Sequence, residues 1–351
     1  MDYMMTSREL VRKAIRFEMP DRLPFTGSMS ETDFSGDTVA IFPDTGLKWW
    51  LGGGGRDEWG SIWEVNPAHK DMGQVKNIVI EDLNGFLSLA VPDALDPARY
   101  AGWDAILRRA EQENKYVVCC NGPYLFERAH FLHGFEKTLV GIMTAPDEIQ
   151  AFIRHIGRYH LDTLRYIGAE FPGRIHGYRG TDDWGSQYAA LIPPSLFRKV
   201  FQPVYGEIFS AVHNAGMDAW MHSCGQIYEI IPLLMEAGMD VINLMQPNVF
   251  PAERLAVFKG KLCFEMCADA QSTLPSGSRE VLKKEIRRIL DACCADNGGL
   301  IEAKLDRMYY EGGNVAPETG EFCHQEYRRR DPFVNKRSMP RRSRGGRTHA
   351  G

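Results

Sequence analysis

The sequence predicts an α/β protein built as a closed (β/α)8 barrel, the TIM-barrel fold. Apolar strand-like runs alternate with amphipathic helical segments, at a spacing of roughly 22–40 residues that is typical of parallel strands joined by helices. The chain has 351 residues, which is long for an ordinary domain and normal for one barrel. Polar residues gather where the expected strands end, and the carboxyl ends of barrel strands are where active sites lie.

The first hundred residues contain one clear helix and one strand candidate. Thr6-Ser-Arg-Glu9 is a capping box, which predicts a short helix that ends before Pro20. Residues 22–30 are the first strand candidate. Residues 31–103 are rich in Gly, Asp and Trp and predict a long irregular insert, and a loop of this length usually forms a lid or a wall of a site.

From Trp103 onward the alternation is regular. A helix with Pro near its start and Gly216 after its end is expected to kink at Pro203. The expected helices cover residues 103–114, 124–143, 146–167, 194–214, 228–237, 252–258 and 279–295. The expected strands cover residues 116–120, 174–180, 218–224, 240–245, 262–268 and 300–305.

Composition indicates a globular protein with ample material for a core. Hydrophobic residues make up 44% of the chain and charged residues 25%. No apolar run approaches the length of a membrane span, and the first residues lack the apolar segment of a signal peptide. We therefore expect a cytoplasmic protein without membrane contact, in which the eight cysteines serve as thiols or metal ligands.

Charge is distributed unevenly along the chain. Nine of the 41 Lys and Arg residues, but only one of the 46 Asp and Glu residues, lie from Arg328 onward, so the remainder has a net charge of about −13. An acidic body argues against nucleic acid as a partner. Residues 334–351 have almost no apolar content and predict a disordered basic tail, which leaves residues 1–333 as a single barrel domain.

His222 and Cys224 form the most distinctive chemical pair in the sequence. They lie two residues apart on an expected strand, so their side chains point to the same face. Their Cα atoms are then roughly 6–7 Å apart, close enough to hold one metal ion. The alternative is that both are packed core residues, since the pattern H-x-C-G is weak by itself.

Other polar residues are expected on the same face. Asp183 is the candidate for a polar contact or a general acid or base, and Gln246 for a hydrogen bond to substrate. Some of these strand-end residues could simply start the following helices. The expected set is Ser28, Asn121, Asp182, Asp183, His222, Cys224, Gln246, Cys267, Asp269 and residues 302–306. The candidate aromatic walls are Trp49, Trp50, Trp59, Trp63 and Trp184.

Several stretches together resemble the uroporphyrinogen decarboxylase-like superfamily, on its cobamide-dependent methyltransferase side. They span about residues 5–302 and occur in the order typical of the superfamily. The stretches are MTSRELVRKAIRFEMPDRLPF, DEWGSIW, DMGQV, TDDWGSQ, HSCGQIYEIIPLLMEAGMDVINLMQP and DAQSTLPSGSREVLKKEIRRIL. The resemblance implies a (β/α)8 barrel of the uroporphyrinogen decarboxylase type.

The resemblance also implies a zinc site. Such methyltransferases hold zinc with an H-x-C pair and a later Cys after a GG-x-I motif. His222 and Cys224 match the pair, and residues 298–301 match the anchor, but the expected third position falls near Asp306 instead of a Cys. Asp306 is the predicted third ligand, with Glu302 or Cys267 as alternatives.

The resemblance implies a corrinoid-dependent methyltransferase. The methyl group would move between a small methylated or methoxylated substrate, or a thiol, and a cobamide carried by a partner corrinoid protein, with Zn²⁺ as the Lewis acid. The decarboxylases carry an MRQAGR-type arginine motif, and residues 20–25 here read PDRLPF. A metal-free decarboxylase-like lyase and a non-catalytic barrel subunit are the alternatives.

Overall fold

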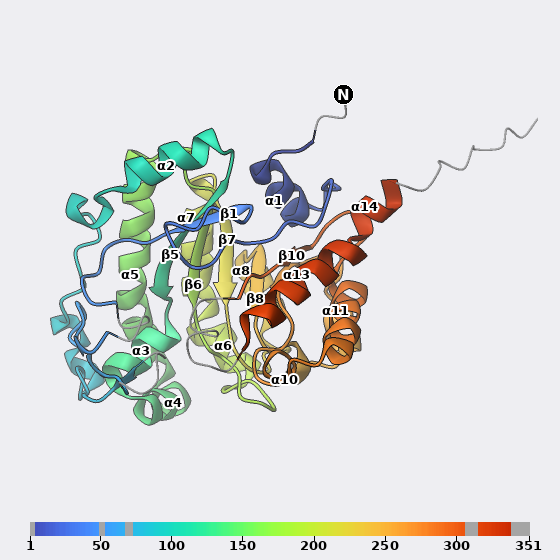
Figure 1. Cartoon of the computed structure of the whole chain (residues 1–351). Helices are drawn as coiled ribbons and strands as arrows, with labels where there is room; N and C mark the ends of the chain where they lie inside the picture. The colour runs from blue at the N-terminus through green and yellow to red at the C-terminus, as the bar shows by residue number, and fades with distance from the viewer. Residues whose placement is uncertain (1–3, 49–52, 67–72, 306–314, 338–351) are drawn as a thin grey trace, which may run out of the picture.

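The computed structural model describes residues 4–48, 53–66, 73–305 and 315–337 (Figure 1). Its centre is a parallel sheet of seven strands in the order β1-β5-β6-β7-β8-β9-β10. The strands are β1 (Thr38–Ile41), β5 (Tyr116–Pro123), β6 (Gly177–Thr181), β7 (Asp218–His222), β8 (Val241–Leu244), β9 (Cys263–Met266) and β10 (Leu300–Glu302). Successive strands are joined by helical crossovers, as a parallel sheet requires.

A short extended segment, Pro24–Thr26, lies between the two edge strands and closes the sheet. On one side the Thr26 amide donates to the Glu302 carbonyl at 2.9 Å, and on the other the Asp37 amide donates to the Phe25 carbonyl at 2.8 Å. Phe25 and Glu302 form a parallel bridge. The strand predicted over residues 22–30 is thus reduced to one bridge, and the closed α/β barrel is confirmed.

Helices surround the sheet and bury one face each against it (Figure 1). The kink predicted at Pro203 is a break between α6 and α7. The helices of this layer are α2 (Trp103–Gln112), α3 (Phe126–His133), α4 (Phe135–Thr144), α5 (Pro146–Glu170), α6 (Pro194–Val200), α7 (Gln202–Asn214), α8 (Ile231–Ala237), α9 (Ala252–Ala256), α10 (Thr273–Ser276) and α11 (Arg279–Cys293).

Helix α1 (Ser7–Arg16) closes the amino-terminal end of the barrel. Its start is the predicted capping box, in which Thr6 and Glu9 bond each other's backbone amides. Val11, Ala14 and Ile15 of α1 are buried in one cluster with inward-facing strand residues. The other members of this cluster are Ala40, Tyr116, Val118, Cys120, Trp220, Val241, Cys263 and Ile301. The lumen is therefore filled at this end.

The segment 31–103, predicted to be irregular, contains the first barrel strand. β1 is only four residues long, and all four are buried. The described part of this segment also carries two 3-10 helices, Leu83–Ser88 and Pro97–Tyr100, and a small antiparallel sheet. That sheet consists of β2 (Gly55–Arg56), β3 (Ile62–Glu64) and β4 (Gln74–Val75).

Among the residues described after β10, two helices are present that the sequence did not predict, α13 (Pro317–Arg330) and α14 (Pro332–Arg337). Cys323 and Tyr327 of α13 are buried in the layer between strands and helices. The predicted tail, residues 334–351, begins inside α14, and its residues from 338 onward lie outside the described part. Among the helices that are described, none combines the length and the apolar character needed to cross a membrane.

Candidate metal centre

His222 and Cys224 lie at the carboxyl end of β7, as predicted. β7 ends at His222, and the chain then turns at Gly225, whose φ is +76°. This turn packs directly on the loop after β6. A Cβ atom on Gly225 would lie 2.1 Å from the carbonyl oxygen of Gly185, and the Gln226 amide donates to the Ser186 carbonyl at 2.7 Å. The two loops are therefore held in one fixed arrangement.

Neighbouring carboxylates at the end of β6 have different roles. Asp182 is fully buried and accepts hydrogen bonds from the backbone amides of Leu125, Phe126 and Glu127, which begin α3, and from the hydroxyl of Tyr205. It thus caps α3. Asp183 turns the other way, toward β7, and its Oδ1 accepts the Cys224 amide at 2.7 Å. Only Asp183 presents its carboxylate to the His–Cys pair.

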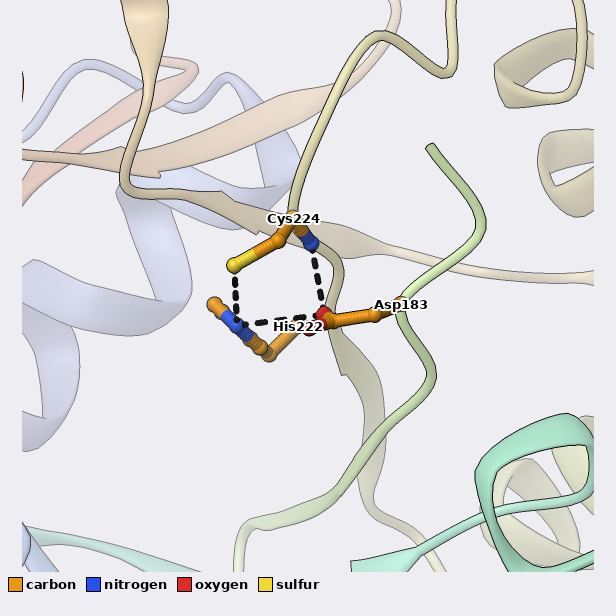
Figure 2. A group of neighbouring side chains, drawn as sticks. All are labelled: Asp183, His222 and Cys224. Carbon is orange, nitrogen blue, oxygen red and sulfur yellow. Dashed lines mark hydrogen bonds and ion pairs between the residues drawn. The ribbon is translucent and has the colours of Figure 1, made fainter. Parts of the chain in front are cut away.

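Asp183, His222 and Cys224 converge on a common point (Figure 2). The Sγ of Cys224 is 3.4 Å from the Nε2 of His222, and the Oδ1 of Asp183 is 3.6 Å from the same nitrogen. Each residue offers one ligand atom, and these atoms all lie within 4.8 Å of one another. Tetrahedral zinc with bonds of about 2.0–2.3 Å separates its ligand atoms by roughly 3.3–3.8 Å. Both separations from the His222 nitrogen fall in this range, and imidazole, thiolate and carboxylate are all groups that bind zinc.

Asn243 on β8 orients the imidazole for ligation. Its Nδ2 donates to the Glu265 carbonyl at 3.2 Å, so its Oδ1 faces the Nδ1 of His222 at 2.6 Å and accepts a hydrogen bond from it. The lone pair of His222 is therefore on Nε2, the nitrogen that faces Cys224 and Asp183. This arrangement, in which a hydrogen bond on one ring nitrogen fixes the other as a donor, is typical of metal-bound histidines.

The thiol of Cys224 lies in surroundings that oppose its ionisation. Burial raises its pKa far above the ordinary value, and the nearby carboxylates of Asp183 and Glu127 raise it further. Without a cation the sulfur therefore keeps its proton. A cation at the centre would reverse this preference, because coordination stabilises the thiolate.

The three donors line a cavity of about 370 Å³ inside the carboxyl end of the barrel. Most of its surface is apolar, with a few charged groups, which is typical of small-molecule sites. The apolar lining includes Met29, Ala40, Phe42, Leu47, Trp59, Val118, Trp220 and Met245. The polar lining includes Ser28, Asp57, Glu58, Asn121, Glu127, Arg128, Arg179, Asp183, Glu265 and Lys304.

Gln246 and the two alternative third ligands lie away from this point. Gln246 is not in the cavity lining, and its Oε1 accepts the Gly225 amide at 2.8 Å, so it supports the β7 loop. Cys267 is buried with its sulfur 3.7 Å from the Sδ of Met245. Glu302 bonds His324 through both carboxylate oxygens at 3.0 Å. Asp306, the predicted third ligand, lies outside the described residues.

The register of the sheet explains why Glu302 points away. Glu302 pairs with Met266, whereas its neighbour Ile301 pairs with Glu265. Ile301 and Glu265 face the lumen, and alternation along a strand directs Glu302 to the helical layer beneath α13.

The tryptophans predicted to form the walls of the site lie in different places. Trp59 lines the cavity, whereas Trp63 and Trp184 are packed elsewhere. Trp49 and Trp50 lie outside the described residues. The cavity lining also includes residues that the sequence did not predict: Glu127, Arg128, Arg179, Trp220 and Glu265. The last three lie on barrel strands, where every second side chain points into the barrel. Counting by twos along each strand could therefore have identified them.

A methyltransferase of known structure shares this architecture. A comparison with curated protein sequences finds no match. A methyltransferase from Methanosarcina mazei is 13% identical with a TM-score of 0.65, and the match covers 92% of this chain and 98% of that one. A D-psicose 3-epimerase solved with D-fructose is 9% identical (TM-score 0.42, covering 83% and 87%). The D-psicose 3-epimerase from Clostridium cellulolyticum H10 is 8% identical (TM-score 0.42, covering 94% and 92%).

A family assignment comes from the sequence itself. Residues 105–303, more than half of the chain, match the family described as uroporphyrinogen decarboxylase (URO-D). The matched segment contains α3, the strands β5 to β10 and all three donors of the candidate centre. The chain therefore belongs to the uroporphyrinogen decarboxylase (URO-D) family.

Proposed function

We propose that this protein is a zinc-dependent methyltransferase that moves a methyl group between a small methylated or methoxylated molecule and a cobamide. The observation that carries the proposal is the convergence of Asp183, His222 and Cys224 at the wall of a closed-ended cavity. A donor set of one imidazole, one thiolate and one carboxylate leaves a fourth position of a tetrahedral ion for substrate. Asp183 is the third ligand in this proposal.

The chain's own residues prepare the site before substrate arrives. Asn243 keeps the Nδ1 proton of His222 in a hydrogen bond, and the contact between Gly185 and Gly225 holds Asp183 and Cys224 together. Zinc held there would act as a Lewis acid on a substrate heteroatom and make it a better leaving group for methyl transfer. The apolar walls exclude water from the transferred methyl group and orient the molecule that carries it.

The structural match described above supports the methyl-transfer part of this proposal. The Methanosarcina mazei protein is a methyltransferase, and its structural match covers 92% of this chain. A cobamide on a partner corrinoid protein would reach the cavity at the carboxyl end of the barrel.

A metal-free lyase is the second candidate, because the family is described as uroporphyrinogen decarboxylase. Arg22 is the only arginine in the segment that replaces the decarboxylase arginine motif. Its guanidinium bonds both oxygens of Asp37, at 2.6 and 2.7 Å, and is not in the cavity lining. It is therefore engaged in holding the Pro24–Thr26 segment against β1, which argues for methyl transfer over decarboxylation.

Metal content and cobalamin absorbance test the proposal together. Protein purified under reducing conditions should carry close to one zinc per chain. With zinc, it should convert cob(I)alamin to methylcobalamin in the presence of a methoxylated aromatic, a methylamine or methanol, or demethylate methylcobalamin in the presence of a thiol. Cys224→Ser should abolish both properties.

Three outcomes would contradict the proposal in different ways. Protein that stays metal-free after zinc incubation would remove the metal centre. Decarboxylation of uroporphyrinogen without methyl transfer in either direction would favour the lyase. A folded, zinc-loaded protein that turns over nothing, even with corrinoid proteins in place of free cobalamin, would favour a non-catalytic subunit.

A further inference from the structure

An ion pair spans the interior of the barrel below the metal centre. The Nη1 of Arg179 on β6 lies 2.7 Å from the Oε2 of Glu265 on β9, and the side chains are only 12% and 3% exposed. β7 and β8 separate these two strands in the sheet. The pair therefore crosses the lumen, beside Trp220, which is the register partner of Arg179 on β7.

Each cation in the described part of the cavity lining has a carboxylate partner. Arg128 lies 3.3 Å from Asp57, with both side chains buried. Lys304 at the rim lies 2.8 Å from Asp33. Together with the pair across the lumen, these contacts account for every lysine and arginine of that lining.

Apart from a metal ion at the candidate centre, the described lining therefore offers an incoming anion no cation without a carboxylate partner. Three further acidic residues, Glu58, Glu127 and Asp183, line the same space, and the side chain of Glu127 is held by a hydrogen bond from Thr181. A carboxylate placed here would lose its hydration without gaining a cation, and burying an unpaired charge is costly. An uncharged molecule does not incur this desolvation cost, and its apolar part can pack against the apolar walls of the cavity.

We propose that the Arg179–Glu265 pair is a specificity determinant that makes the cavity select uncharged methyl ethers with an apolar, ring-sized body and reject their carboxylated analogues. The part that names a methyl ether rests on the proposed function. The rejection of carboxylates rests on the charge pairing alone.

Binding measurements without turnover test this inference separately from the proposed function. Veratrole and veratrate share a dimethoxybenzene ring, and veratrate adds one carboxylate. Their Kd values would be measured by titration calorimetry in EDTA, so that a metal ion cannot hold the carboxylate. The wild type should prefer veratrole by about tenfold or more. In Glu265→Gln, which keeps the side-chain shape and removes the negative charge, veratrate should bind at least about tenfold more tightly and veratrole within about twofold of the wild type.

Two control variants show whether Arg179 causes the tighter binding of veratrate in Glu265→Gln. Arg179→Met combined with Glu265→Gln should lose the gain for veratrate, because the released guanidinium is gone. Glu236→Gln breaks an exposed pair with Arg198 on the surface and should change neither affinity.

Several results would overturn the inference. One is a wild type that binds veratrate as well as veratrole, or that binds neither compound. Another is an unchanged preference in folded Glu265→Gln, or a gain that persists in the double variant. If circular dichroism shows that Glu265→Gln does not fold, the ratio of the veratrole and veratrate Kd values in the wild type decides whether the inference stands. Loss of methyl transfer with this preference intact would contradict only the proposed function.

Discussion

The ends of β7 and β10 both carry metal-competent residues, yet among the described residues only the β7 end belongs to a group of three that could hold a metal ion. At β7, His222 and Cys224 face the cavity, and the Nε2 lone pair of His222 is directed at the other donors. At β10, Glu302 is turned into the helical layer, and both of its oxygens bond His324. The residue type alone therefore does not predict which side chains can bind a metal ion. The strand register and the existing hydrogen bonds determine which potential ligands remain available.

The most direct test of this comparison is to remove the cysteine at the β7 end and, as a control, a cysteine beside the β10 end. Cys224→Ser should lower zinc affinity by about a thousandfold, because a hydroxyl is a poor substitute for a thiolate ligand. Cys267→Ala, the control, removes a buried cysteine directly after β9, the strand that pairs with β10, and should keep the metal. Competition with a chromogenic chelator measures both. Equal zinc loss in the two variants would contradict the assignment of the β7 end.

The glycine contact tests how the β7 end is held in place. Gly225→Ala should destabilise the protein by about 2–4 kcal/mol, because the residue has a positive φ and its Cβ would clash with the Gly185 carbonyl. Gly216→Ala is the matched control, since its φ is also positive, at +75°, but nothing lies within 4 Å of its Cβ. Measured by urea unfolding, Gly216→Ala should lower the free energy of unfolding by about 1 kcal/mol. Equal losses in the two variants would mean that the contact between the loops does not contribute to stability.

Asn243→Ala should weaken zinc binding by about 10- to 100-fold without removing a ligand. The loss follows because His222 would no longer be fixed in the tautomer that presents Nε2. Chelator competition measures the affinity, and a circular dichroism spectrum checks the fold. Asn248→Ala, which removes hydrogen bonds to Ser272 and Thr273 outside the cavity, should leave the affinity unchanged.

The smallest effect is expected at β10. Burial raises the pKa of Glu302, and the hydrogen bond from His324 offsets part of the shift. Because the unfolded carboxyl ionises at its ordinary pKa, near 4.5, rising pH stabilises the unfolded state more than the folded one. The Tm of Glu302→Gln relative to wild type should therefore increase as pH rises from about 4.5, with zinc content unchanged. A Tm difference that is independent of pH, or a loss of zinc, would contradict this account.

Much of the barrel could be predicted from local patterns. The capping box at Thr6, the proline break near residue 203 and the strand predicted over residues 218–224 depend on neighbouring residues. The structure confirms the first two, and the strand is present but ends two residues earlier, at His222. β1 was missed because four buried residues within a Gly- and Asp-rich segment produce no periodic signal. It is a strand only because β5 and the Pro24–Thr26 segment lie beside it.

The candidate centre was predictable in part for the same reason. The spacing of His222 and Cys224 is a local property, whereas the choice between Asp182 and Asp183 depends on which carboxylate the start of α3 captures. The Arg179–Glu265 pair joins residues 86 positions apart, and no local pattern links them. Long-range register, which only the folded sheet provides, selects these partners.

The plug formed by α1 has a kinetic consequence. Val11, Ala14 and Ile15 fill the lumen at one end, so the cavity is a blind well that is reached from the carboxyl end of the barrel. A small molecule at the bottom of such a well has to arrive before a macromolecule covers the opening and cannot depart until that macromolecule leaves. In the proposed reaction this geometry imposes a compulsory order, in which the small substrate binds first and its product is released last.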